Sequence, residues 1–360
     1  MKKNFLTMVF FLFVLFTLPS CNRESKVSTP PSSETETPVI EEPNIDEKEV
    51  SEEELSEDDP NKITSPLDGL KYYKEDLAKR PVAVSIDNHP RARWQAGLSQ
   101  AEIIYEFEVE NPYTRYLCIF LAKEPERVGP VRSARPYIIY YALENDGIFV
   151  HVGGSEDAFS EISRLSAADI DGLYSSSMWR YYETNKSAPH NMYTTLKQIR
   201  AEADKKGYKS DASFEGYSFY KKNTSLSEKY NASKAEKINI TYNKDNTTDY
   251  TYDKEKKKYF RFKDCEKHID ELNNQQLTAK NIIIIEAAKK ILDNAGRLYL
   301  GTIGKGNGLY ITNGQSIPIT WEKKSEKGRT RFFANGEVLT MNPGNTWIQV
   351  INRLSSVKIE

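Results

Sequence analysis

Residues 22–66 constrain the fold most, because their composition keeps them out of any hydrophobic core. The stretch has no aromatic side chain, few apolar ones, and fourteen acidic residues against four basic ones. Such a chain cannot bury enough apolar surface to offset the conformational entropy that folding costs. We therefore expect a disordered acidic tether with a random-coil reach of roughly 35–40 Å. It serves as a spacer or, alternatively, as an acidic docking site for a basic partner.

The segment before the tether, residues 1–21, has the layout of a lipoprotein signal peptide. Lys2 and Lys3 precede an apolar run that is shorter than the about 20 residues of a membrane span. The run closes on the sequence Leu-Pro-Ser-Cys, which fits the bacterial lipobox. We expect lipidation of Cys21 by a diacylglyceryl group, with acyl chains such as palmitate that anchor the protein to a membrane. The alternative is a plain secretory leader.

The charge of the chain is divided unevenly between tether and body. The whole chain carries −2, the tether −10, and residues 67–360 carry +6. This balance excludes a polycationic nucleic-acid binder, so we expect no nucleic-acid partner. The mildly basic body suits polyanionic surroundings such as wall polymers.

Residues 67–225 predict an α/β domain with a mixed sheet. Stretches 81–87, 103–110, 114–122 and 147–153 have the apolar patterns of strands. Helices are expected from residue 133 or 135 to about 145, over 155–165 and over 193–206. Hairpins occur beside crossover connections, so the fold class is α+β.

Residues 235–360 predict a smaller, mostly-β domain. Short strand patterns follow one another, separated by turns such as Asn313-Gly314. The glycine-rich stretch 301–308 precedes a strand rather than a helix, so we expect a glycine hairpin and not a phosphate loop. The boundary between the domains is expected in the Lys-, Asn- and Ser-rich stretch 221–237.

The remaining cysteines, Cys118 and Cys265, lie in dissimilar contexts, one apolar and one charged. We expect two free thiols. No Cys or His spacing indicates a zinc site, so we expect neither a metal nor another cofactor.

Several motifs in residues 66–360 resemble the YerB family of Gram-positive lipoproteins, a domain family of unknown function. The most specific are Gly129-Pro-Val-Arg-Ser-Ala-Arg-Pro136 and Pro189-His-Asn191. Other shared stretches are 81–90, 97–101, 105–106, 114–115, 153–155, 319–321 and 342–349. The resemblance implies a lipid-anchored, two-domain protein on the extracytoplasmic face of the cell membrane. It implies no activity.

The strongest ligand-binding candidate is the Arg132-Ser133-Ala134-Arg135 motif, where a helix is expected to begin. Exposed backbone N–H groups and guanidinium forks at such a place suit a phosphate, sulfate or carboxylate. Arg115 is expected to reach the same spot, with Asn191 and Arg180 near it. Alternatively, Ser133 is a helix cap and the arginines pair with Glu106 or Glu110 inside the domain.

The catalytic candidates are His190, Asp87, His89 and Glu106, since histidine and carboxylates are the usual acid–base groups. Glu106, Glu108 and Glu110 alternate with Tyr105, Phe107 and Val109, so the acids share one strand face. No nucleophile elbow accompanies Ser133 or Ser155. The alternatives are that the histidines form turns, that His151 has a core position, and that the acids meet solvent or basic partners.

Three functions are compatible with these features. The first is a lipid-anchored envelope protein whose N-terminal domain binds an anionic envelope ligand or a protein partner. The second is a cell-wall hydrolase or transferase that uses His190, Asp87, His89 and Glu106. The third is a scaffold for another membrane protein, without a small ligand.

Overall fold

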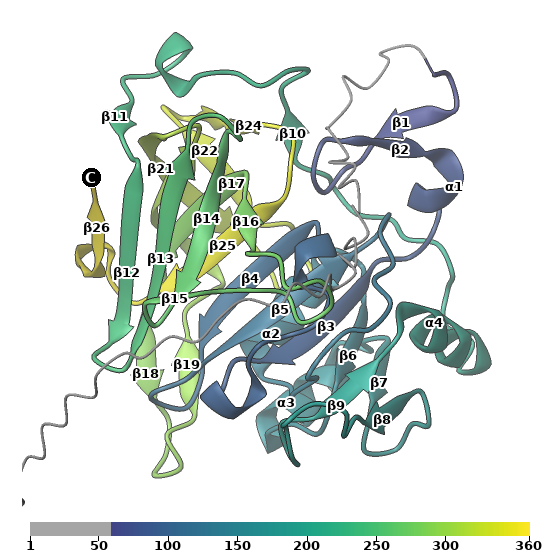
Figure 1. Cartoon of the computed structure of the whole chain (residues 1–360). Coiled ribbons are helices and arrows are strands. Elements are labelled where there is room, and N and C mark those ends of the chain that lie inside the picture. The colour runs from purple at the N-terminus through teal and green to yellow at the C-terminus, as the bar shows by residue number, and fades with distance from the viewer. Residues whose placement is uncertain (1–58) are drawn as a thin grey trace, which may run out of the picture. The chain divides into compact units, whose positions relative to one another are not determined.

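The computed structural model describes residues 59–360 (Figure 1). The expected leader, Cys21 and residues 22–58 of the expected tether lie outside the described residues. Within 59–360, every helix is too short or too polar to cross a bilayer.

A 12-stranded sheet crosses the described structure, in the order β23-β22-β21-β20-β17-β25-β4-β5-β3-β6-β7, with β11 added beside β21. Its strands are β23 (Glu337–Val338), β22 (Arg331–Ala334), β21 (Gln315–Lys323), β20 (Gly304–Thr312), β17 (Asn281–Glu286), β25 (Thr346–Ile351), β4 (Ile103–Glu108), β5 (Thr114–Phe120), β3 (Val82–Asp87), β6 (Ile148–His151), β7 (Asp169–Asp171) and β11 (Ser233–Lys234). The pairing of β25 with β4 joins the C-terminal strands to the N-terminal ones. The two halves of the sequence therefore share one sheet.

Eight strands of this sheet run in the same direction: β21 and β23, together with the six strands β17, β25, β4, β3, β6 and β7. β25 is parallel to β17 and to β4, while β4 and β3 are each antiparallel to β5. β6 is parallel to β3, and β7 is parallel to β6. The carboxyl ends of these strands therefore lie along one edge of the sheet, called here the carboxyl edge. The residues that end the latter six strands are Glu286, Ile351, Glu108, Asp87, His151 and Asp171.

Each face of the large sheet is covered by a different layer. Helices α2 (Pro136–Leu143) and α3 (Glu156–Arg164) share a core with alternate side chains of the sheet, among them Phe107. On the other face lie α4 (Leu196–Lys205) and a six-stranded sheet, β15-β14-β13-β12-β26 with β16 beside β14. Its strands are β12 (Lys237–Asn243), β13 (Asn246–Asp253), β14 (Lys258–Lys263), β15 (Glu266–Lys267), β16 (Thr278–Ala279) and β26 (Val357–Ile359).

Short elements complete the structure. They are β1 (Lys62–Thr64), β2 (Lys71–Tyr73), α1 (Lys74–Leu77), β8 (Met178–Arg180), β9 (Met192–Thr194), β10 (Ser218–Phe219), β18 (Lys289–Ile291), β19 (Leu298–Leu300), β24 (Thr340–Met341) and the 3-10 helices η1 (Pro90–Ala92), η2 (Leu98–Gln100), η3 (Leu226–Glu228) and η4 (Leu354–Ser356).

The structure confirms the α+β class and both free thiols, with Cys118 buried and Cys265 exposed. Three local expectations need correction. The helix expected from residue 133 or 135 begins at Pro136, and its N-cap is Arg135, so Ser133 is not the cap. The helix expected from residue 193 begins at Leu196, because 192–194 pair with β8.

The third correction concerns the glycine-rich stretch 301–308, expected as a hairpin. Residues from Gly304 onward are part of strand β20 and pair with β21. A Cβ at Gly306 would lie 2.7 Å from Nε1 of Trp321, which is too close for any side chain. The glycine at position 306 therefore allows strand β20 to pack closely against the buried Trp321.

Candidate functional site

The Gly129–Arg135 segment is held between the end of β3 and strand β9. The N–H of Asp87 donates to Pro130 O (2.8 Å), and the N–H of Val131 donates to Met192 O (2.6 Å). Gly129 has φ 154°, and a Cβ there would lie 2.8 Å from Met192 O. This close approach of two backbones places Arg132 beside the carboxyl end of β3.

Five predicted site residues meet there and form what we call the Asp87 cluster: Asp87, His89, Arg115, Arg132 and His190. Nδ1 of His190 lies 2.8 Å from Oδ2 of Asp87, and Nε of Arg132 lies 3.3 Å from the same oxygen. The N–H of His89 donates to Oδ1 of Asp87 (3.0 Å). Arg115 is the cross-strand partner of Asp87 on β5, and its Nη1 donates to Ser133 O (2.8 Å).

Cationic groups outnumber acidic ones in the Asp87 cluster. Burial alone would raise the pKa of Asp87, but the His190 hydrogen bond and the two guanidinium charges outweigh it and lower this pKa. Burial and the nearby charge of Arg135 lower the pKa of Arg115 to about 10. Nε of Arg115 is buried without a hydrogen-bond partner among the described residues. Asp87 thus contacts one guanidinium group, that of Arg132, and lies near the charge of a second, and the Arg132 side chain is 28% exposed.

The two imidazoles of the cluster stack on each other. The ring centroids of His89 and His190 are 4.3 Å apart, and those of His89 and Tyr113 are 4.4 Å apart. Nδ1 of His89 accepts from Arg91 N–H (3.0 Å), and Nδ1 of His190 contacts Asp87. Burial and the neighbouring His190 lower the pKa of His89. Within residues 59–360 no hydrogen bond is recorded for either Nε2, so both atoms are free to meet a ligand or carry a proton.

Other predicted site residues lie outside the Asp87 cluster. Arg135 pairs with Glu110 through Nε (2.8 Å) and Nη2 (2.5 Å), as the alternative interpretation expected. Burial would raise the pKa of Glu110, but Arg135 and Arg115 lower it. Arg180 donates to Oδ1 of Asn191 (3.2 Å), and Asn191 follows His190 in the chain. Ser133 takes part through its carbonyl oxygen, which accepts hydrogen bonds from Ser85 and Arg115, rather than through its hydroxyl.

Ser155 and His151 have structural roles. Oγ of Ser155 accepts from Ala158 N–H and caps α3. His151 is fully buried, with Nε2 3.2 Å from Oδ2 of Asp169. The core position expected for His151 is therefore confirmed. No group of three metal-ligating side chains is found within the described part of the chain.

Glu106 points to the opposite face of the sheet from the Asp87 cluster. The cross-strand neighbours Asp87, Arg115 and Phe107 share one face, and Glu106 is one residue out of phase. It is fully buried, 2.6 Å from Nη2 of Arg261 and 3.5 Å from Nζ of Lys263. Burial would raise the pKa of Glu106, but these two cations lower it. The four catalytic candidates therefore do not meet in one site.

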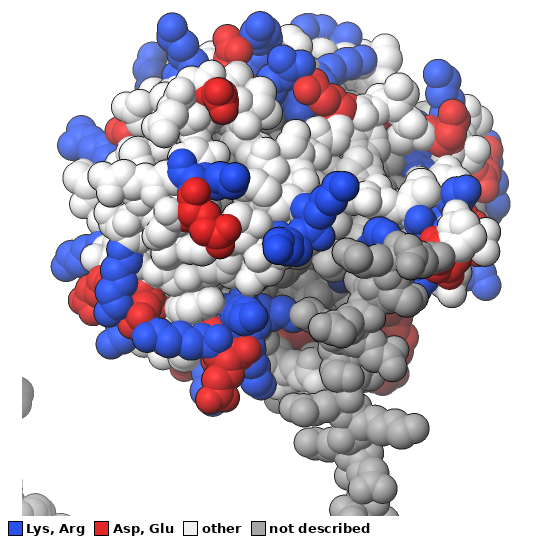
Figure 2. All heavy atoms as spheres, turned by 90° about the horizontal axis from the view of Figure 1, so that it is seen from above, with Lys and Arg blue, Asp and Glu red and all other residues white. Residues whose placement is uncertain are grey.

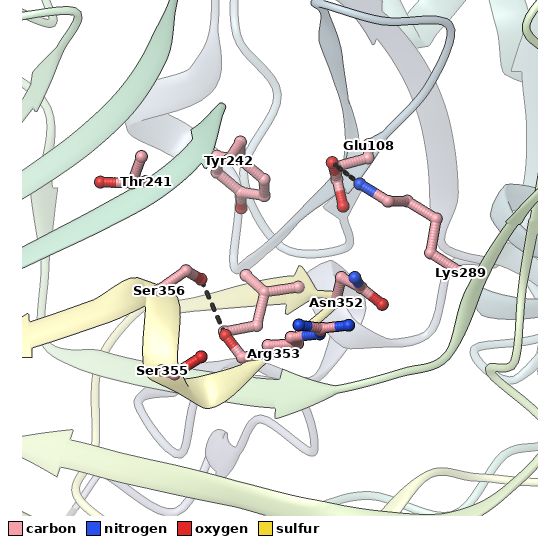
Figure 3. Close-up of a pocket in the computed structure, with 9 residues that line it drawn as sticks. Glu108, Thr241, Tyr242, Lys289, Asn352, Arg353, Ser355 and Ser356 are labelled. Atoms are coloured by element: carbon pink, nitrogen blue, oxygen red, sulfur yellow. Dashed lines mark hydrogen bonds and ion pairs between the residues drawn. The ribbon is translucent and has the colours of Figure 1, made fainter. Parts of the chain in front are cut away.

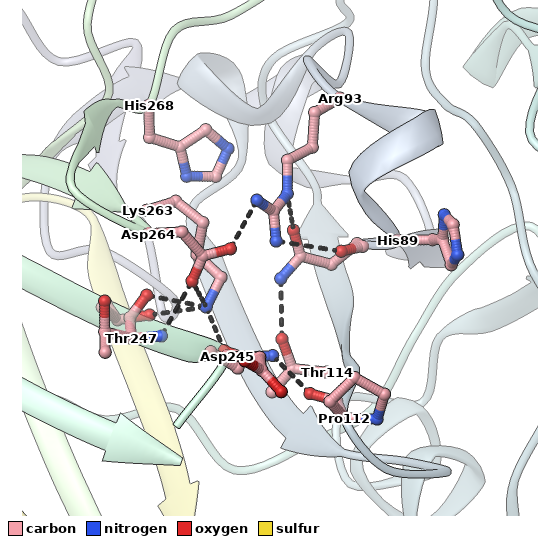
Figure 4. Close-up of polar contacts among 12 residues, drawn as sticks. His89, Arg93, Pro112, Thr114, Asp245, Thr247, Lys263, Asp264 and His268 are labelled. Carbon is pink, nitrogen blue, oxygen red and sulfur yellow. Dashed lines mark hydrogen bonds and ion pairs between the residues drawn. The ribbon is translucent and has the colours of Figure 1, made fainter. Parts of the chain in front are cut away.

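The Glu106 partners belong to a buried polar network that the sequence does not predict. The guanidinium of Arg261 lies 4.0 Å from the Trp347 ring centroid, and its Nε contacts Nδ1 of His268 (3.0 Å). Burial and Arg261 hold the pKa of His268 well below its usual value. Figure 4 shows the rim of this network, where Arg93 reaches Asp264 at 2.6 Å. These contacts tie β14 and the turn after it to the N-terminal half.

The surface of the body is mixed in charge. On the face seen in Figure 2, Lys and Arg side chains lie interspersed with Asp and Glu side chains. The excess positive charge of the body therefore does not form one single-signed field on that face.

Two parts of the chain match the two domains of one protein family. The model described as "Protein of unknown function (DUF3048) N-terminal domain" matches residues 67–209, and the C-terminal domain of the same family matches residues 238–348. The chain is 35% identical over 307 residues to a Bacillus subtilis (strain 168) protein named "Putative lipoprotein YerB". That match covers 84% of this chain and 90% of the relative.

A solved structure agrees with the fold. The crystal structure of the YerB protein from Bacillus subtilis aligns with a TM-score of 0.74 at 34% identity. The alignment covers 83% of this chain and 99% of that one. None of these descriptions names a ligand or a reaction.

Proposed function

This chain belongs to the YerB (DUF3048) family, and from that premise we propose that it is a lipid-anchored envelope protein whose body binds an anionic ligand at the Asp87 cluster. The lipobox at Cys21 and the lipoprotein name of the relative support the anchor. Two guanidinium groups and an imidazole around a single carboxylate support the ligand site, and this observation carries the proposal.

The anchor predicts a modified cysteine at the mature N-terminus. Cys21→Ser should move the full-length protein from the membrane fraction to the soluble fraction, because no acyl chains can then attach. Cys265→Ser removes the exposed thiol of the body and should leave the protein in the membrane fraction. Mass spectrometry of the native protein checks the modification directly, and an unmodified thiol at position 21 would contradict the anchor.

The ligand site predicts different effects for two neighbouring arginines. Arg132→Ala should weaken co-sedimentation of the full-length protein with isolated cell walls by about tenfold, because a partly exposed guanidinium group is lost. Its free energy of unfolding should change by less than about 1 kcal/mol, since its contact with Asp87 is long and partly exposed.

Arg135→Ala is the matched comparison. It should leave wall binding unchanged but lower the free energy of unfolding by about 1–2 kcal/mol, because Glu110 loses two hydrogen bonds. Co-sedimentation with walls stripped of their phosphate polymers tests which anion is bound. Loss of binding to the stripped walls would identify those polymers as the ligand. If Arg132→Ala unfolds the protein while wall binding survives, Arg132 is an internal ion-pair residue and the ligand site is refuted.

A second candidate function, a wall hydrolase or transferase, is favoured by one contact. Asp87 contacts Nδ1 of His190, and Nε2 has no hydrogen bond within residues 59–360, an arrangement found in pairs that act as a general base. Glu106 would take no part, because it lies on the other face of the sheet. Soluble fragments released from purified wall polymers by the wild type, and lost in His190→Gln, would favour this candidate.

A further inference from the structure

A polar pocket opens on the carboxyl edge of the large sheet, with a cavity volume of about 240 Å³ (Figure 3). Its lining comes from segments that are far apart in the sequence: the end of β4, strand β12, strand β18, and the end of β25 with the turn after it. The residues are Glu108, Thr241, Tyr242, Lys289, Ile351, Asn352, Arg353, Ser355 and Ser356.

The topology makes this a favoured place for a ligand. Strands β17, β25 and β4 are adjacent and parallel, and the pocket lies where they end. Glu108 ends β4, Ile351 ends β25, and Lys289 follows the end of β17. In sheets with parallel strands, ligands bind in the crevice beyond the carboxyl ends, where connections leave the sheet. None of the Asp87 cluster residues lines this pocket.

Several hydrogen-bond donors in the pocket lack a protein partner. Within residues 59–360, no side-chain hydrogen bond or ion pair is recorded for Arg353, Asn352 or Ser355. The carbonyl oxygen of Arg353 accepts from Oγ of Ser356 (2.8 Å), which shapes the turn and leaves the guanidinium at the pocket. Arg353 and Ser355 are exposed and Asn352 is half-buried, so these donors meet solvent and can exchange it for a ligand rich in acceptor oxygens.

The charges of the pocket do not cancel. Nζ of Lys289 lies 2.6 Å from Oε1 of Glu108, so these two charges compensate each other. Arg353 has no acidic partner among the described residues, which leaves one net positive charge. A singly charged ligand matches this balance, and the planar fork of Arg353 suits an oxyanion.

We propose that this pocket binds a singly charged oxyanion, a phosphodiester or a carboxylate, held by Arg353 with Asn352 and Ser355. The proposal does not rest on the Asp87 cluster. It assigns a second anion site to the same edge of the sheet, built mainly from the C-terminal half of the chain.

The test is thermal unfolding of the full-length protein in detergent, titrated at constant ionic strength with dimethyl phosphate, acetate or chloride. Binding to the folded state raises Tm with ligand concentration. We expect dimethyl phosphate or acetate to raise Tm above the chloride series, and Arg353→Gln to weaken that apparent affinity by about tenfold or more. Asn352→Ala should weaken it less, since a neutral donor is lost.

Lys358→Gln is the matched control, because Lys358 is an exposed cation on β26 that does not line the pocket. It should bind like the wild type. Arg353→Gln should also weaken binding in an Arg132→Ala background, which separates this site from the Asp87 cluster. A response to dimethyl phosphate alone identifies a phosphodiester, and a response to acetate alone identifies a carboxylate. The proposal is overturned if neither anion exceeds chloride, or if Arg353→Gln responds like the wild type.

Discussion

Glu106→Gln should lower the free energy of unfolding by about 3–5 kcal/mol, because it removes the carboxylate shared by two fully buried cations. Arg261 and Lys263 would keep their burial while losing their counter-charge, and the cost of an unpaired buried charge is large. Chemical denaturation of the full-length protein, followed by tryptophan fluorescence, measures the change. Trp347 packs on Arg261 and therefore reports on this region.

Glu108→Gln is the matched control on the same strand. Burial raises the pKa of Glu108 despite the opposing effect of Lys289, and the Lys289 side chain is 28% exposed. Loss of this pair should therefore change the free energy of unfolding by about 1 kcal/mol or less. Equal effects for the two variants would show that the Glu106 ion pairs do not stabilise the fold.

Asp87→Asn should remove about 2 kcal/mol of stability near neutral pH, because His190 and Arg132 lose a charged acceptor and Arg115 loses a nearby counter-charge. The pKa of Asp87 in the folded state lies below its ordinary value of 3.8. Its contribution is therefore present above about pH 4 and is lost as pH falls through the lowered pKa. The difference between wild type and variant should shrink on acidification from pH 6 to pH 2.

Asp169→Asn provides the comparison for that acid profile. Asp169 also contacts a histidine, His151, but its side chain is 23% exposed and no arginine pairs with it in the described structure. Its loss should cost clearly less than the loss of Asp87. A pH-independent difference for Asp87→Asn would mean that Asp87 does not stabilise the fold as a carboxylate.

The two proposed anion sites share one structural origin. Parallel strands end side by side at the carboxyl edge. Arg132 and His190 meet Asp87 at the end of β3, and Arg353 follows the end of β25. Because the sites lie on different strand ends, Arg132→Ala and Arg353→Gln separate them experimentally. Loss of wall binding in both variants would indicate a polymer that contacts the edge at two points.

The Asp87 cluster was largely predictable, because motifs of unusual composition mark its members. Asp87, His89, Arg132 and His190 each border a strand or helix, and the sequence indicates this. Tyr113 was missed, since nothing beyond its place in a turn distinguishes it. The separation of Arg135 from the cluster was left open, because residue type alone does not decide between a ligand and Glu110.

The amino-acid sequence by itself determined the expected cellular location, through the lipobox and the acidic tether. It also determined secondary-structure elements, through patterns such as the alternation that puts Tyr105 and Phe107 in a core. Burial patterns repeat every two residues along a strand, so they can be read locally. Only the tertiary structure decided the partners. Glu106 meets Arg261 across 155 positions of sequence, and the Arg353 pocket unites four separate segments, because the order of strands in the sheet is not encoded in any local pattern.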